Sequence, residues 1–172
     1  MLDKDFFKKV RILDGGMGQE LLERGLKTEG TLWSASALIE KKYHKLITNT
    51  HIDFVKSGAE VIVTTTFSAR RIKLRENNIE HKFEQLNFIA AQLASKVKLK
   101  YPKILVAGGL PPQNLVYEAD VRPDKEIKQN FYDQAKIINS FVDFFYLEVI
   151  SSVKEIQLAI EALKSFNKPY LI

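Results

Sequence analysis

Short apolar runs alternate along this chain with longer stretches in which apolar residues recur at helical spacing. The first run, residues 10–13, breaks into an acid and three glycines: Asp14, Gly15, Gly16 and Gly18. Runs rich in apolar and β-branched residues are typical of buried strands, and glycines let the backbone turn sharply after one. The predicted strands are residues 10–13, 59–67, 104–107, 144–147 and 168–172.

Helical spacing of apolar residues fills the intervals between these runs. The predicted helices cover about residues 19–24, 37–57, 70–77, 80–100, 127–142 and 153–163. Ser152 and Glu155 match a capping box that would open the last helix. The charges of residues 70–77 are assigned to solvent.

Regular alternation of strand and helix favours an α/β fold, with a parallel sheet covered by helices. Two architectures fit: a doubly wound open sheet, or part of an eight-stranded βα barrel. A barrel typically takes about 250 residues. The 172 residues therefore resemble, as a single domain over residues 1–172, four βα units of a (β/α)8 barrel with a fifth strand begun.

The composition is that of an ordinary globular protein, with 45% hydrophobic and 27% charged residues. A net charge of +5 is spread along the chain, so we expect no nucleic-acid partner. No cysteine is present, which excludes a thiolate nucleophile or thiolate metal site from this chain. No stretch approaches the roughly 18 apolar residues of a membrane span, and residues 1–7 lack a leader-like apolar run; we expect a cytoplasmic protein without a membrane partner.

Several motifs at the strand ends together resemble the homocysteine S-methyltransferase family. They are residues 14–21 with Arg24 and Gly25, residues 32–35, His51 with Phe54 and Gly58, residues 64–67 with Arg71, residues 107–112, residues 122–124, and Glu148. The match spans nearly the whole chain, and several motifs in the same order are more specific than any one of them.

The resemblance implies a βα barrel that binds homocysteine, activates its thiol on zinc, and transfers a methyl group from a small donor to give methionine. In the family the zinc ligands are cysteines near the ends of later strands, so no zinc is expected to bind this chain, and no catalytic residue is assigned within it. Two departures weaken polar contacts: Thr65 stands where the family usually has Asn, and Val149 where it usually has Thr.

Two carboxylates are the main candidates for binding substrate. Gly15 and Gly16 are further candidates for substrate binding, next to Asp14. Asp14 is either a plain turn former or a ligand of the amino acid's ammonium group. Glu148 either caps the next helix or pairs with a surface lysine, or it holds the same ammonium at the barrel mouth, the role that the resemblance to the family implies. We favour the binding role for both. A nucleotide-phosphate site is disfavoured, because the third glycine of the dinucleotide fingerprint is missing.

The remaining candidates each have a structural alternative. Trp33 is either core or a contact to substrate. Thr65 and Thr66 are candidates for substrate binding, although β-propensity alone explains some of the threonines in this strand. His51 reads as a packed or capping histidine rather than a metal ligand.

Two functional hypotheses follow from these residues. The first is the amino-acid-binding half of a homocysteine S-methyltransferase. The second is a non-catalytic split or truncated half-barrel that needs a complementary half, or else an inert remnant. In either case open sheet edges predict self-association or dependence on a partner half.

Overall fold

The computed structural model describes residues 5–172, which form a parallel sheet backed by helices. Residues 1–4 belong to the stretch in which the sequence shows no leader-like apolar run, and they lie outside the described residues. The four strands lie side by side in their order along the chain. They are β1 (Val61–Val63), β2 (Leu105–Leu110), β3 (Phe144–Leu147) and β4 (Tyr170–Leu171). All three pairings are parallel. Consecutive order without reversal is that of a βα barrel, not of a doubly wound sheet.

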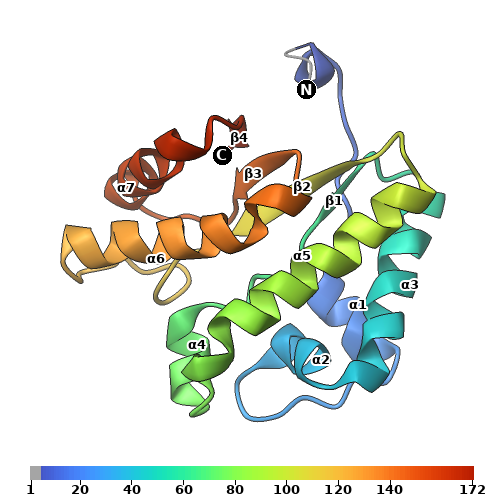
Figure 1. Ribbon diagram of the computed structural model, residues 1–172, viewed down its shortest axis with the longest axis horizontal. Coiled ribbons are helices and arrows are strands. Elements are labelled where there is room, and N and C mark those ends of the chain that lie inside the picture. The colour runs from blue at the N-terminus through green and yellow to red at the C-terminus, as the bar shows by residue number, and fades with distance from the viewer. Residues whose placement is uncertain (1–4) are drawn as a thin grey trace.

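Within residues 5–172, seven α-helices accompany the sheet. They are α1 (Met17–Glu23), α2 (Ser36–Ile39), α3 (His44–Lys56), α4 (Arg71–Glu76), α5 (Phe83–Lys100), α6 (Asp124–Ile138) and α7 (Val153–Leu163). Short 3-10 turns η1 (Phe6–Lys8), η2 (Trp33–Ala35), η3 (Lys41–Tyr43), η4 (Glu80–Lys82), η5 (Asn139–Phe141) and η6 (Lys164–Phe166) flank them. Figure 1 shows α3, α5, α6 and α7 following one another in an arc along the sheet, the arrangement of an outer helical ring.

Alternate strand residues face opposite sides of the sheet, and each side has its own core. Ile62, Val106 and Phe145 pack with the inner stripes of α5, α6 and α7. Val61, Ala107 and Phe144 form a smaller cluster on the other face, which corresponds to the inside of a barrel. Period-two alternation of the strands thus separates a helix-covered face from a concave one.

The first apolar run does not form the strand predicted for residues 10–13. Only Leu13 makes a β-bridge, to Val61. Glu60 N donates to Ile12 O at 2.8 Å, and Asp14 N donates to Val61 O at 2.9 Å. The backbone of this segment is therefore hydrogen-bonded to the start of β1. Val10 and Ile12 are 93% and 56% exposed. The run has the composition of a strand, but it lacks a second neighbour among residues 5–172.

Three other boundaries differ from prediction. β1 ends at Val63, because residues 65–68 form a turn. β2 continues through Gly108 and Gly109, which were expected to break it. The helix predicted over residues 37–57 is divided at Glu40, whose backbone is extended (φ −99°, ψ 115°). Residues 144–147 form the strand as predicted.

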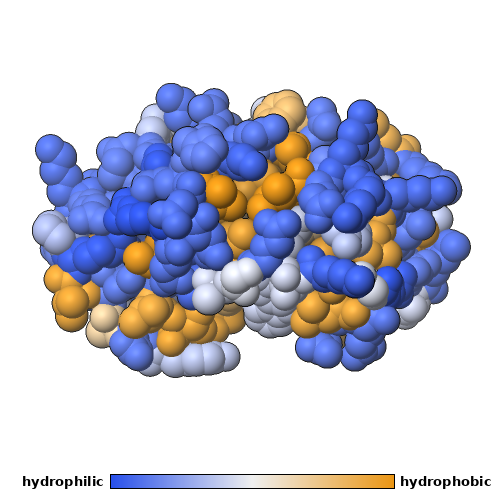
Figure 2. All heavy atoms as spheres, turned by 90° about the horizontal axis from the view of Figure 1, so that it is seen from below, coloured by the Kyte–Doolittle hydropathy of each residue, from blue (hydrophilic) through white to orange (hydrophobic). Residues whose placement is uncertain are grey.

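The face of the molecule that Figure 2 shows is mostly hydrophilic. Seen from below the view of Figure 1, apolar side chains gather in separate patches, one of them near the middle of this face (Figure 2). Within residues 5–172 no helix combines the length and apolar character needed to cross a bilayer.

Candidate binding site at the ends of the strands

A pocket of about 430 Å³ lies where the first apolar run, β1 and β3 end. This is the side on which βα barrels bind their ligands. Its lining residues are Leu13, Asp14, Gly15, Gly16, Met17, Gly18, Trp33, Ser34, Val63, Thr64, Thr65, Phe67, Tyr146 and Glu148. Six of the seven residues predicted to bind substrate are therefore brought together here. The seventh, Thr66, is not.

Asp14 is held by the backbone of the neighbouring strand. Its Oδ2 accepts a hydrogen bond from Val63 N at 2.9 Å, and its side chain is only 4% exposed. The Nδ1 atom of His51, a fully buried residue of α3, lies 3.6 Å from the same oxygen. The hydrogen bond from Val63 N fixes the carboxylate at the pocket wall, and Oδ1 has no hydrogen bond to the described residues.

Glu148 follows β3 and lies over a glycine of β2. A Cβ on Gly109 would be 2.6 Å from Glu148 Oε1, so the carboxylate occupies the space that a side chain would take. Burial, followed by the nearby negative charge of Asp14, raises the pKa of Glu148 to about 7, and the charge of Arg70 opposes this rise. A pocket in which one acid, Glu148, is disfavoured in its ionised form by a neighbouring carboxylate is suited to receive a cation.

Tyr146 belongs to the same wall, although sequence reasoning did not select it. It lies two residues before Glu148 and so faces the same side of β3. Burial raises the pKa of the Tyr146 hydroxyl, and Glu148 and Asp14 add to the effect. Strand periodicity counted back from Glu148 was the signal that could have found it.

Trp33 forms another wall of the pocket and is not a core residue. It is 43% exposed and adopts φ 45° at the start of η2. A Cβ on Gly18 would lie 2.8 Å from Trp33 Cε2, so the glycine allows the indole to pack on the start of α1. A Cβ on Gly15 would likewise lie 2.8 Å from Cε1 of Phe54 on α3.

The three threonines after β1 have different positions. Thr64 and Thr65 line the pocket. Thr66 is fully buried, and its hydroxyl donates to Gly109 O at 2.6 Å and lies 2.9 Å from Thr64 Oγ1. Thr66 therefore supports the turn and the β2 backbone beneath Glu148.

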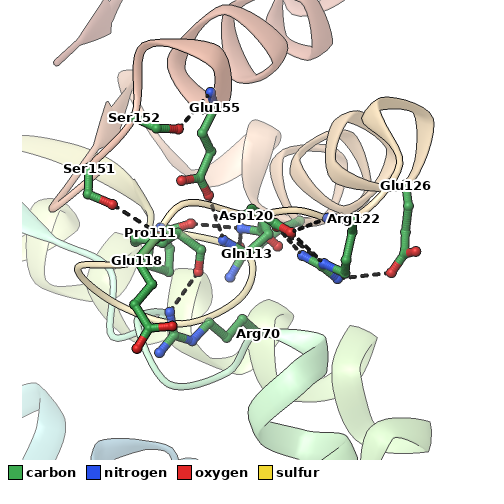
Figure 3. A network of polar contacts seen from close by, with 12 residues as sticks. Arg70, Pro111, Gln113, Glu118, Asp120, Arg122, Glu126, Ser151, Ser152 and Glu155 are labelled. Carbon is green, nitrogen blue, oxygen red and sulfur yellow. Dashed lines mark hydrogen bonds and ion pairs between the residues drawn. The ribbon is translucent and has the colours of Figure 1, made fainter.

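Arg70 contradicts the assignment of residues 70–77 to solvent, because it is only 2% exposed. Its Nη1 donates to Pro112 O at 2.6 Å, and burial lowers the pKa of its guanidinium. The loop after β2 is also held from α7, where Glu155 Oε1 accepts from Gln113 N at 3.1 Å. Figure 3 shows Arg70 and Glu155 approaching this loop from opposite sides.

The predicted capping box of α7 is half formed. Ser152 Oγ accepts from Glu155 N at 3.1 Å, as expected. Glu155 Oε1 accepts from Gln113 N of the loop and Oε2 has no hydrogen bond to the described residues, so the carboxylate does not accept from Ser152 N. Burial is the main cause of the raised pKa of Glu155.

Comparison with known proteins decides the family. The family model described as Homocysteine S-methyltransferase matches residues 11–172. The chain belongs to the homocysteine S-methyltransferase family. Its resemblance at the strand ends is thereby confirmed.

The similar curated proteins are longer than this chain. S-methylmethionine–homocysteine S-methyltransferase of Pongo abelii is 33% identical over 165 residues, which cover 95% of this chain and 42% of that protein. Betaine–homocysteine S-methyltransferase 1 of Rattus norvegicus is 32% identical over 166 residues, which cover 94% of this chain and 39% of that protein. The chain thus spans about two fifths of these relatives.

A solved structure of the family has the same fold. The metallated form of the homocysteine methyltransferase MmuM from Escherichia coli superposes with a TM-score of 0.82 at 23% identity, covering 96% of this chain and 63% of that one. The four parallel strands and their helices therefore match part of the homocysteine methyltransferase barrel, as predicted.

The residues present do not fit a zinc site. The sequence has no cysteine. Among residues 5–172 no group of three or more His, Cys, Asp and Glu side chains is placed to hold a metal ion. The chemistry that this chain's own residues offer is the binding and orientation of a small cationic or zwitterionic ligand.

Proposed function

We propose that the pocket binds homocysteine, with its ammonium group between Asp14 and Glu148. The carrying observation is that these two carboxylates line one pocket at the carboxyl ends of the strands, and that Glu148 has a raised pKa partly because Asp14 is near. An ammonium ion placed there offsets the repulsion and gives each acid a charged hydrogen-bond donor. Family membership supports homocysteine as the amino acid.

The other residues that line the pocket indicate where the side chain of homocysteine would lie. Trp33, Met17 and Phe67 supply apolar and polarisable contacts for a thiol-bearing side chain. Thr65 and Ser34 supply hydroxyls at the rim. Methyl transfer from a small donor to the homocysteine thiol, giving methionine, is the proposed activity of a complete barrel that contains this part. Binding is the part of that activity that these residues carry.

Calorimetry with reduced L-homocysteine tests the proposal. We expect saturable binding by the chain and at least about tenfold weaker binding by D14N and by E148Q, because each loses a hydrogen bond between charged groups. E161Q removes an exposed carboxylate of α7 that pairs with Lys128, and should bind like the wild type. The absence of binding to the wild-type chain, or equal binding by D14N and E148Q, contradicts the assignment.

A second candidate function is a non-catalytic half-barrel that associates with a complementary half or with itself. The exposed first run, with Val10 at 93% and Ile12 at 56%, and the exposed Tyr170 and Ile172 at the other edge support it. Unpaired apolar strand edges are templates for pairing. Light scattering coupled to gel filtration, alone and with a second polypeptide carrying later barrel strands, should show dimers or a complex. A cooperatively folded monomer that does not bind the second polypeptide would rule out this second function.

A further inference from the structure

His51 lies behind the pocket, between two of its lining residues. Its ring is fully buried on α3. Nδ1 is 3.6 Å from Asp14 Oδ2, and Nε2 is 3.5 Å from Thr65 Oγ1. Asp14 precedes α1, and Thr65 follows β1, so one imidazole bridges two separate turns of the site.

The arrangement leaves Nδ1 without a hydrogen bond. A buried polar atom without a partner costs about 1–3 kcal/mol, so a histidine used only for packing would be poorly placed here. The gap of 3.6 Å to Asp14 is a few tenths of an ångström beyond a hydrogen bond. Contacts of this kind often tighten only when a ligand is bound.

Donor and acceptor rules select one tautomer of the ring. A carboxylate only accepts, so the hydrogen directed at Asp14 must be on Nδ1. Nε2 of the neutral ring is then an acceptor and takes the Thr65 hydroxyl hydrogen. With its hydrogen turned toward His51, the Thr65 oxygen has its lone pairs free for a donor in the pocket.

We propose that His51 is a positioning residue for the ammonium site. Its Nδ1–H holds the Asp14 carboxylate in place, and its Nε2 turns the Thr65 hydroxyl so that it accepts from the ligand. Val63 N fixes the same Asp14 oxygen from the strand side, so the carboxylate is held between backbone and imidazole. The inference rests on the proposed binding of homocysteine, and it gives a positioning role to a residue that sequence analysis interprets as a packed or capping histidine.

Two substitutions separate positioning from packing. His51→Asn keeps a donor near the position of Nδ1, whereas His51→Leu has no polar side-chain atom. We expect His51→Leu to weaken L-homocysteine binding at least about tenfold and His51→Asn to recover most of the loss. The deaminated analogue 4-sulfanylbutanoate, titrated at millimolar concentrations, should bind all variants alike, because it lacks the ammonium.

The matched control is His44→Leu on the same helix. His44 Nε2 contacts Leu38 O at 3.0 Å, away from the pocket, so its loss should leave homocysteine affinity unchanged. The proposal is overturned if His51→Leu binds like the wild type, if His51→Asn is no better than His51→Leu, or if the affinities for both ligands fall equally.

Long-range ¹H–¹⁵N NMR of the unliganded wild-type chain provides a test that needs neither binding nor a His51 variant. The proposal expects an Nδ1–H tautomer for His51 that is lost or redistributed in D14N. An Nε2–H tautomer that D14N leaves unchanged overturns the positioning role. If homocysteine fails to bind while the tautomer is as expected, the proposed ligand is wrong and the Asp14–His51 relationship stands.

Discussion

Glu148 Oε1 lies 2.6 Å from the point that a Cβ of Gly109 would occupy. The glycine of one strand therefore makes room for the acid of the next, and β2 and β3 are paired in register at this level, with Gly109 opposite Tyr146. The Glu148 carboxylate can take this position because Gly109 has no side chain.

G109A should displace the Glu148 carboxylate. The new methyl group would also meet Val63 Cγ1 at 2.9 Å, so the wall cannot absorb it by moving Glu148 alone. We expect a loss of about 1–3 kcal/mol in the free energy of unfolding, measured with urea, and weaker homocysteine binding.

The matched control is G108A. Its methyl group would meet Ile138 Cδ1 at 2.8 Å on the helix-covered face. It should destabilise the chain to a comparable degree and leave the pKa of Glu148 in place. Equal effects of the two variants on the Glu148 titration, followed by carboxyl ¹³C NMR, would contradict the role given to Gly109.

The raised pKa of Glu148 makes the folded chain less stable at high pH. The folded state holds this proton up to about pH 7, whereas the unfolded chain releases it near an ordinary glutamate pKa of about 4.3. The contribution of Glu148 to stability is therefore full below about pH 4.3 and is lost as the pH rises to 7. By this reasoning E148Q should be more stable than the wild type at pH 8, by at most about 4 kcal/mol, with the difference vanishing toward pH 4.

Urea unfolding of both proteins from pH 4 to pH 8 measures this difference. Glu155 is also a buried acid with a raised pKa, but it is present in both the wild type and E148Q, so its contribution cancels in the difference. A stability difference that is constant with pH would show that Glu148 is not the titrating group.

Sequence periodicity predicted the sheet and its helices because the buried faces are regular. Residues 144–147 are apolar throughout and form β3 exactly at those bounds. The prediction of a strand over residues 10–13 was wrong because apolar composition does not supply a second neighbouring strand, and Ile12 stays 56% exposed. The acids Asp14 and Glu148 could be placed in one pocket from the sequence because the ends of parallel strands meet on one side of a sheet.

Long-range packing explains what the sequence did not reveal. Arg70 has the local context of a surface helix, and only the approach of Pro112, 42 residues later, gives its guanidinium a buried partner. Thr66 faces the β2 backbone and not the pocket, because the strand ends at Val63 and a turn resets the alternation. Strand periodicity cannot be carried through such a turn.

Val149, which follows Glu148, carries backbone strain that a substitution should relieve. Its φ is 59°, in the left-handed region that β-branched residues avoid, and its side chain is 42% exposed. V149N should stabilise the chain by about 1 kcal/mol, since asparagine tolerates this conformation and little packing is lost. V121N is the control, because Val121 is 88% exposed and has no positive φ. Thermal unfolding should separate the two variants, and equal melting temperatures would argue against strain at residue 149.

Homocysteine binding should depend on pH through Glu148. A bound ammonium favours the ionised acid, so binding below its pKa of about 7 requires release of a proton. Affinity should then fall about tenfold for each pH unit below 7, down to about pH 5.5, a range in which the ligand's amino group stays charged. E148Q should bind weakly and without this slope. Calorimetry at pH 6 in two buffers of different ionisation enthalpy counts the released protons directly. About one released proton is expected for the wild type and none for E148Q. A wild-type affinity that does not change with pH would place the ammonium group elsewhere.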